Sequence, residues 1–172
     1  QTSGEALDRL PAQCNFVRKF DNRFGIKPGL NAIRELTRAM GNPQSAYHCL
    51  IVAGTNGKGS VVAMVDAALR SAGYRVGRYT SPHLRSVTER FVVDNTVISE
   101  SVLRREAASI QAHSERLVAS GRLPHPPTFF EATTAIALSW FRRTRVDLAL
   151  LEVGLGGQFD ATNVVNPLAG VI

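Results

Sequence analysis

Cysteine is scarce in this chain: Cys14 and Cys49 are the only two among 172 residues. They lie far apart in sequence and match no metal-ligand spacing, and two cysteines are too few for a disulfide-stapled fold. We therefore interpret both as reduced, buried thiols of a cytosolic protein.

Long hydrophobic runs are also missing. No apolar stretch approaches the ~20 residues that span a bilayer, and the first residues, Gln1 to Glu5, carry no signal-peptide pattern. The sequence therefore predicts a cytoplasmic protein without a membrane segment. Organellar targeting stays open, because Gln1 is not an initiator methionine and the chain can be a piece of a longer protein.

Acidic residues are fewer than basic ones, 14 against 20, which gives a net charge of +6. The basic residues are scattered and are not clustered with interleaved aromatics, so the pattern is not that of a nucleic-acid binder. Two interpretations remain: a solvated surface, or a field that attracts anionic small molecules. We favour the second because of the glycine-rich segment described next. The composition, 44% hydrophobic and 20% charged, is typical of one globular domain.

Glycine is concentrated in the segment Gly54-Thr55-Asn56-Gly57-Lys58-Gly59-Ser60. An apolar run precedes this segment and a helical pattern follows it, so it joins a strand to a helix. Glycines let backbone N–H groups close around phosphate oxygens, and the helix N-terminus adds positive partial charge. Lys58 supplies a full charge, and Ser60 is the nearest hydroxyl for a magnesium ion.

This segment departs from the general phosphate-loop pattern at two positions. Val52 stands where that pattern has glycine, and Gly59 stands where it has serine or threonine. The segment therefore predicts a phosphate loop of a particular subclass. The alternative is a glycine-rich turn with an incidental lysine.

Hydrophobic periodicity predicts alternating strands and helices. Helices are expected at 5–10, 30–40, 61–72, 100–119 and 128–141, strands at 49–53, 75–80, 147–153 and 168–172, and a short surface hairpin at 91–98. Ser99 and Thr128 are expected N-caps, the latter in a capping box with Glu131. The third helix is expected to turn Val62, Val65, Ala68 and Leu69 inward, and Trp140 and Phe141 are expected in the core.

These elements predict an α/β fold, a three-layer αβα domain like those of P-loop NTPases, with a mainly parallel sheet and a small surface hairpin. The domain is expected to be truncated, because the chain stops inside its last apolar strand.

Ligands of open parallel sheets bind beyond the carboxyl ends of the strands. The phosphate loop follows the first strand, Ser81 and His83 follow the second, and Glu152 ends the third. An acid at the tip of a buried strand beside a phosphate loop suits a magnesium ligand, although a solvated strand-end acid is the plainer alternative. His83 can be a ligand or base, or a histidine held in a turn.

Two further polar segments remain open on local pattern alone. Glu89-Arg90 is interpreted as a structural ion pair or a turn anchor. Asp160 can cap a loop or contact a substrate.

Six ordered motifs together resemble the folylpolyglutamate synthase and dihydrofolate synthase family, within the Mur ligase superfamily. They are Gly54 to Ser60, Tyr79 to Leu84, Thr88 to Arg90, Phe130-Glu131, Leu151 to Gly157, and Asp160 to Asn163; Phe24 to Leu30 fits as well. The resemblance covers nearly the whole chain from Phe24 onward, and six motifs in order are far more specific than one.

The resemblance implies an ATP-dependent ligase. In this family ATP phosphorylates a pteroate or folate carboxylate, and the amine of L-glutamate then attacks the acyl phosphate. It implies ATP binding by Thr55, Asn56, Gly57, Lys58, Gly59 and Ser60, with Lys58 catalytic, and Mg²⁺ binding by Ser81 and Glu152. It implies substrate binding by Gly25, Ile26, Lys27, Pro28, Thr128, Phe129, Phe130, Glu131, Phe159, Asp160 and Ala161.

The family pattern also implies what lies outside this chain. Residues 1–172 correspond to an incomplete N-terminal ATP-binding domain, without the C-terminal domain, the histidine that completes the magnesium site and the lysine that becomes carbamylated. The isolated piece is therefore expected to be inactive and the full-length protein monomeric, with dihydropteroate or a reduced folate, L-glutamate and ATP as its small-molecule partners. Gln158 stands where the family usually has arginine, so an ionic substrate contact is not expected there.

Two other functions stay open. The chain can be a nucleotide-binding module or switch without ligase activity, which Gln158 and the missing catalytic half suggest. A plain P-loop kinase fits less well, because Gly59 interrupts the loop and no acceptor base is evident. The sequence does not separate dihydrofolate synthase from polyglutamylation activity.

Overall fold

The fold is organised around a mainly parallel sheet. The computed structural model describes residues 29–172 and contains one sheet with the strand order β4-β3-β2-β5-β1-β6. The parallel strands are β1 (His48–Val52), β2 (Val76–Tyr79), β5 (Leu148–Glu152) and β6 (Ala169–Val171). The antiparallel pair β3 (Phe91–Val93) and β4 (Thr96–Val97) extends the β2 edge.

β5 lies between β1 and β2, although it comes last of the three in sequence. Its five residues are all buried, as expected of an apolar strand with neighbours on both edges and layers on both faces. Val52 and Glu152 are register partners, and so are Tyr79 and Leu151. The carboxyl ends of these three strands therefore meet at one edge of the sheet.

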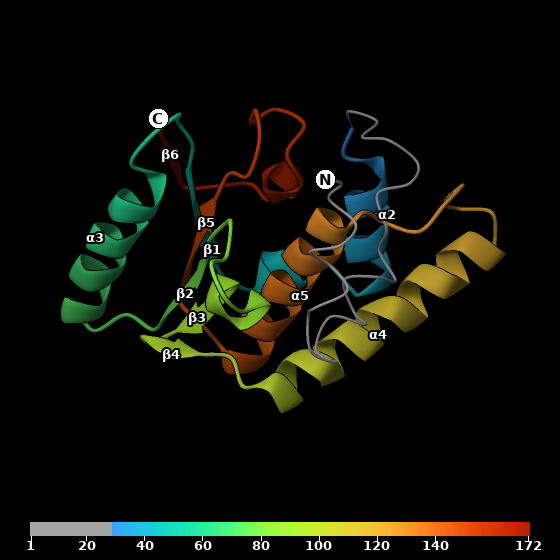
Figure 1. Ribbon diagram of the computed structural model, residues 1–172, viewed down its shortest axis with the longest axis horizontal. Helices are drawn as coiled ribbons and strands as arrows, with labels where there is room; N and C mark the ends of the chain where they lie inside the picture. Colours follow the sequence, from blue (N-terminus) through green and yellow to red (C-terminus); the bar gives the residue numbers. More distant parts are fainter. Residues whose placement is uncertain (1–28) are drawn as a thin grey trace, which may run out of the picture.

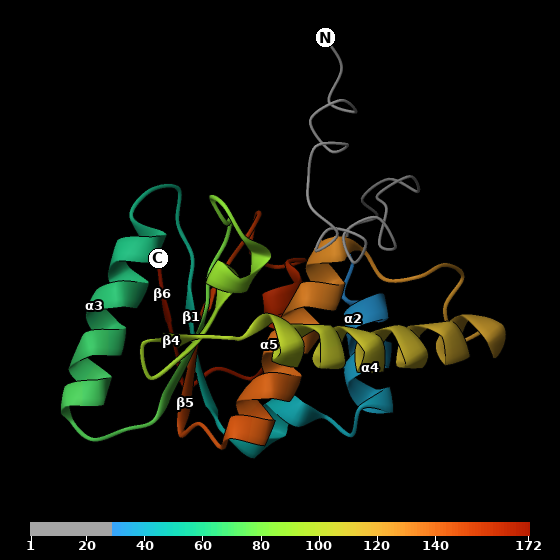
Figure 2. The same ribbon diagram turned by 60° about the horizontal axis from the view of Figure 1, so that its bottom comes forward.

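Helices cover both faces of the sheet, which confirms the three-layer prediction. Figures 1 and 2 show α3 (Lys58–Ser71) alone on one side and α5 (Phe129–Thr144) on the other. Beyond α5 pack α2 (Asn31–Ala39) and α4 (Glu100–Ala119). Val52 and Leu150 join the core under α3, whereas Ile51 and Leu151 join the core under α5.

α5 is buried nearly all round because the sheet lies on one side and two helices lie on the other. The predicted capping box is present: the Thr128 N–H donates to Glu131 Oε2 (2.7 Å), and the Glu131 N–H donates to Thr128 Oγ1 (3.3 Å). Trp140 and Phe141 lie in the core as predicted. The capping box thus fixes where α5 begins, at the same edge as the strand ends.

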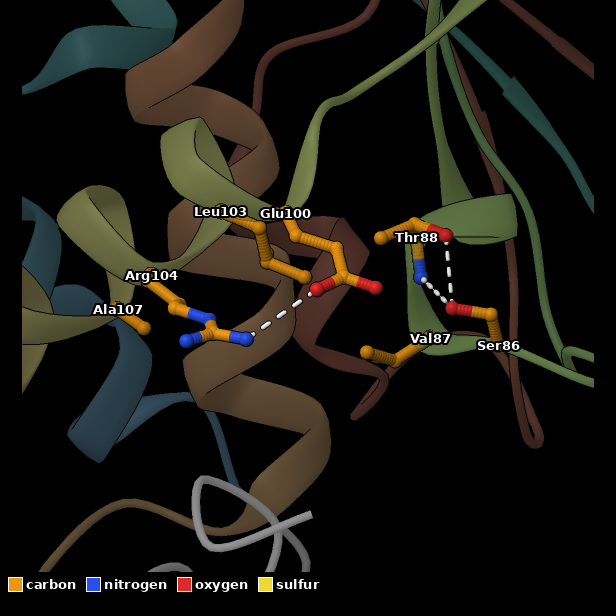
Figure 3. Close-up of a pocket in the computed structure, with 7 residues that line it drawn as sticks. All are labelled: Ser86, Val87, Thr88, Glu100, Leu103, Arg104 and Ala107. Atoms are coloured by element: carbon orange, nitrogen blue, oxygen red, sulfur yellow. Dashed lines mark hydrogen bonds and ion pairs between the residues drawn. The ribbon is translucent and has the colours of Figure 1, made fainter. Parts of the chain in front are cut away.

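Ser99 caps α4 as predicted, because its Oγ accepts a hydrogen bond from the Val102 N–H (3.4 Å). The start of α4 packs against the short 3₁₀ helix η3 (Val87–Arg90). Figure 3 shows the niche between them, rimmed by the Glu100–Arg104 ion pair (3.2 Å). Its volume of about 40 Å³ is close to that of one water molecule, so it is a packing gap and not a ligand site.

Two expectations about side-chain burial were wrong. Residues 91–98 form the predicted hairpin, with Asp94 and Asn95 at positive φ (48° and 62°), but β3 is not on the surface. Its three apolar residues are buried because β3 adds a strand to the main sheet. Ala68 was expected inward on α3 and is exposed, whereas Asp66 is buried and pairs with Arg70 and Arg78.

Three further predictions concern the cysteines, the N-terminal segment and the absence of a membrane segment. Cys49 is a buried free thiol, as expected, and burial raises its pKa to about 12. Cys14, the helix at 5–10 and the loop Gly25 to Pro28 lie outside the described residues. No helix within 29–172 is long and apolar enough to cross a membrane.

Candidate active site

Glu152 lies at the centre of the edge where the three strands end. It is 5% exposed, and its Oε2 accepts a hydrogen bond from the Ser81 N–H (3.0 Å). This bond joins the end of β5 to the turn after β2, so the two predicted magnesium ligands are brought together. Within residues 29–172 no group of three or more His, Cys, Asp or Glu side chains forms a metal cluster. A carboxylate and a hydroxyl are a partial set, which fits Mg²⁺ because that ion keeps several waters and phosphate oxygens as ligands.

The glycine-rich loop lies beside Glu152, after β1. Gly54 and Gly57 have φ values of 126° and 79°, a region that glycine adopts without strain. Gly57 is the N-cap of α3, and no side chain caps the helix. The first N–H groups of α3 therefore lack intrahelical acceptors and stay available to an anion.

Lys58 is half-buried at the first position of α3, and its Nζ donates to the Gly54 carbonyl oxygen (2.9 Å). The ammonium group therefore lies against the backbone of the glycine-rich loop. Thr55, Asn56, Gly59 and Ser60 are exposed around it. Apart from the half-buried Lys58, the predicted nucleotide-binding residues are therefore open to solvent.

A cleft of about 510 Å³ adjoins the Ser81–Glu152 pair, because Ser81 lines it, and we call it the strand-end cleft. The N-terminus of α5 and the loop at 154–161 form much of its wall. Its lining residues are Gly29, Ser81, Pro82, Arg90, Thr128, Phe130, Glu131, Gly154, Leu155, Gly156, Phe159, Asp160 and Ala161. Every described residue that was predicted to bind substrate lines the cleft except Phe129. The four predicted residues at 25–28 lie outside the described residues, and the adjacent Gly29 lines the cleft.

Asp160 caps a loop, although it also lines the cleft. Its Oδ2 accepts from the N–H groups of Gly154 (3.0 Å) and Leu155 (2.8 Å), and its Oδ1 accepts from the N–H (3.0 Å) and hydroxyl (2.6 Å) of Thr162. Both carboxylate oxygens are therefore used to hold the loop after β5. Gln158 is exposed, and its carbonyl oxygen accepts from the side chain of Asn163 (3.1 Å).

Glu89 anchors the turn after β2. Its carboxylate accepts from the N–H groups of Leu84, Arg85 and Ser86 (2.9, 3.0 and 2.8 Å), and these backbone hydrogen bonds, that of Leu84 foremost, lower its pKa. Among the described residues Glu89 makes no ion pair with Arg90, so the ion-pair alternative was wrong and the turn-anchor alternative was right.

His83 is held in the same turn. Its Nδ1 accepts from Arg90 Nε (2.9 Å), and its pKa is lowered by burial and then by the charge of Arg90. The ring is therefore neutral at pH 7 with its proton on Nε2. This geometry favours the turn-held histidine over the ligand or base.

Arg90 was missed as a candidate site residue. It is 7% exposed, lines the strand-end cleft, and its guanidinium carbon lies 5.4 Å from the centre of the Phe129 ring. The available signal was its place in the Thr88 to Arg90 motif, to which no substrate or metal role was assigned.

Comparisons with known proteins show what the chain as a whole is similar to. A probable bifunctional folylpolyglutamate synthase/dihydropteroate synthase of Haloferax volcanii is 46% identical over 92% of this chain and 18% of its own length. An FPGS–AMPPCP–folate complex has a TM-score of 0.85 and 35% identity, over 92% of this chain and 38% of the other.

A crystal structure of a bifunctional folylpolyglutamate synthase/dihydrofolate synthase with Mn, AMPPNP and L-glutamate bound has a TM-score of 0.80 and 32% identity. The match covers 92% of this chain and 37% of the other. No family model matches the chain. The resemblance indicated by the motifs is confirmed over nearly the whole chain, which spans less than two fifths of the length of these proteins.

Replacing Asp160 with Asn tests its capping role. An amide accepts hydrogen bonds on one side only, so about half of the contacts that hold the loop are lost, and we expect the free energy of unfolding to fall by about 1–3 kcal/mol. Urea denaturation measures this. Glu115→Gln, the same chemical change on the exposed side of α4, serves as the control. Equal stability of Asp160→Asn and wild type would contradict the capping role.

Proposed function

We propose that this chain, which is related in sequence and fold to the folylpolyglutamate and dihydrofolate synthases, is the nucleotide- and folate-binding part of an ATP-dependent ligase. The complete protein joins L-glutamate to the carboxylate of dihydropteroate or a folate. The observation that carries the proposal is the adjacency of the phosphate loop, the Ser81–Glu152 pair and the strand-end cleft at one edge of the sheet. A ligase of this type needs ATP, a metal and an acid at a single place.

The proposed reaction has two steps. A carboxylate oxygen of the acid attacks the γ-phosphorus of ATP, and ADP leaves with the electrons of the broken P–O bond. The glutamate amine then attacks the acyl carbon, inorganic phosphate leaves, and the amine loses a proton. Neither step needs a nucleophile from the protein, which fits a site without a paired nucleophile and base.

Each group of residues has one task in this scheme. The α3 N-terminus and the loop at 54–57 hold the triphosphate, and Lys58 neutralises charge that develops on the γ-phosphate. Ser81 and Glu152 hold Mg²⁺, which supplies Lewis-acid stabilisation of the phosphate oxygens when bound. The related structures with AMPPCP and with Mn and AMPPNP support this use of nucleotide and divalent metal.

The strand-end cleft binds the acid substrate. Phe130 and Phe159 provide aromatic surface for a flat heterocycle, and Phe159 is 58% exposed at the cleft. Glu131 and the backbone at 154–161 provide polar contacts. The related folate complex supports this assignment. The part of the protein outside this chain binds glutamate and completes the metal site.

The complete protein should release phosphate only when pteroate or folate, glutamate and ATP are all present. Phosphate release is measured while each substrate is omitted in turn, and dihydropteroate is compared with a reduced folate to separate the two activities. ATP binding without acid- and amine-dependent turnover would contradict the ligase and favour the alternative of a nucleotide-binding module.

Lys58→Ala should lower kcat of the complete protein by about 10²–10³-fold, because it removes a charge that stabilises the transition state. The fold should stay intact, since the side chain of Lys58 makes a single, exposed hydrogen bond within residues 29–172. Steady-state kinetics and circular dichroism check both statements. Arg104→Ala, which removes an exposed cation on α4, is the control. Unchanged kcat in Lys58→Ala would refute its role.

Glu152→Gln should raise the Mg²⁺ concentration needed for half-maximal turnover by roughly 10- to 100-fold. Glutamine keeps an oxygen that accepts from the Ser81 N–H but lacks the charge that attracts the ion. A Mg²⁺ titration of turnover measures the effect. Glu106→Gln changes another buried carboxylate, which pairs with Arg143 between α4 and α5, and should leave the Mg²⁺ dependence unaltered. An equal rise in the required Mg²⁺ concentration in both variants would contradict the assignment of Glu152 as a metal ligand.

A further inference from the structure

Arg90 is the one buried cation among residues 29–172. Its Nε donates to His83 Nδ1 (2.9 Å), and its guanidinium carbon lies 5.4 Å from the centre of the Phe129 ring. Arg90 makes no ion pair with any described residue. Within residues 29–172 its charge therefore has no carboxylate partner.

Two other buried charges in the described part of the fold have ion-pair partners. Asp66 pairs with Arg70 and Arg78, and Glu106 pairs with Arg143. A buried charge without a counter-ion is costly, and stacking on an aromatic ring offsets only part of the cost. An anion entering the strand-end cleft would supply the missing partner.

The two carboxylates that line the same cleft do not fill this role. Glu131 accepts from the Thr128 N–H, and Asp160 accepts from four donors of its own loop. Neither lies within ion-pair distance of Arg90 among the described contacts. Among the described residues the cleft therefore offers a carboxylate acceptor at Glu131 and, at Arg90, a cation without an ion-pair partner, which suits a ligand with ring N–H donors and a carboxylate.

Arg90 is also close to the strand end where the nucleotide and metal are placed. The carbonyl oxygen of Arg90 accepts a hydrogen bond from the Thr80 N–H (3.1 Å). Ser81, which follows Thr80 in the sequence, donates its own N–H to Glu152. The bond to His83 and the contact with Phe129 fix the plane of the guanidinium, as bidentate recognition of a carboxylate requires.

We propose that Arg90 binds the carboxylate of the acid substrate and holds it beside the phosphate loop. This assignment rests on the proposed function and extends it, because it names the residue that selects an acid. At neutral pH the carboxylate is the charged group of pteroate, whereas the pterin ring is neutral, so the carboxylate is the group that compensates Arg90.

The test compares two ligands on the complete protein by calorimetry without nucleotide: pteroate, and 6-methylpterin, which lacks the benzoate carboxylate. Arg90→Gln should weaken pteroate binding at least about tenfold and leave 6-methylpterin binding unchanged. Arg90→Lys keeps the charge without the planar fork, so it should restore part of the pteroate affinity. Binding of AMPPCP reports that each variant is folded.

Three outcomes decide against the assignment. Equal losses for both ligands would mean that Arg90 contacts the ring or only supports the cleft. Unchanged pteroate affinity in Arg90→Gln would remove Arg90 from the site. If Arg90→Gln does not fold, the affinities of Arg90→Lys are compared with those of the wild type. Weaker binding of pteroate alone supports the assignment, and weaker binding of both ligands overturns it. Failure of the wild-type protein to bind pteroate would instead refute the proposed function itself.

Discussion

The hydrogen bond from the Ser81 N–H to Glu152 Oε2 joins the two strand ends on which the site depends. It fixes a buried carboxylate at the centre of the sheet edge, between the phosphate loop that follows β1 and the turn that follows β2. Because β5 lies between β1 and β2, this acid lies between the loop to which we assign the nucleotide and the turn that borders the strand-end cleft. The proposed function depends on this order of the strands.

The loops around this edge are held in a common way. Glu89 accepts three backbone N–H groups of the turn after β2, and Asp160 accepts two N–H groups of the loop after β5 and two donors of Thr162. Each carboxylate replaces the backbone partners that an irregular loop lacks. Both loops line the strand-end cleft, so these carboxylates hold the walls of the cleft in place.

Local features of the sequence predicted the elements well, because they depend on neighbouring residues. The Thr128–Glu131 capping box, the Ser99 cap and the apolar run of β5 all act within a few residues. The burial of β3 and the inward turn of Asp66 were not predicted, because each depends on a partner distant in sequence: β2 for the former, Arg78 for the latter. For the same reason the sequence did not predict the burial of Arg90, since its surroundings are formed by the turn at His83 and the start of α5. In the candidate site, motif order predicted residues that the fold brings to the strand-end cleft, but only the fold showed that Asp160 caps a loop.

The central claim is that this edge of the sheet brings a substrate carboxylate to the γ-phosphate of ATP. The most direct measurement follows oxygen from pteroate labelled with ¹⁸O in its carboxylate, during ligation of glutamate by the complete protein. Attack of the carboxylate on phosphorus, followed by displacement of phosphate by the amine, must carry one labelled oxygen into each inorganic phosphate released. Mass spectrometry of the phosphate should therefore show a single ¹⁸O per molecule. Phosphate without the label, formed while the glutamate conjugate accumulates, would contradict the account.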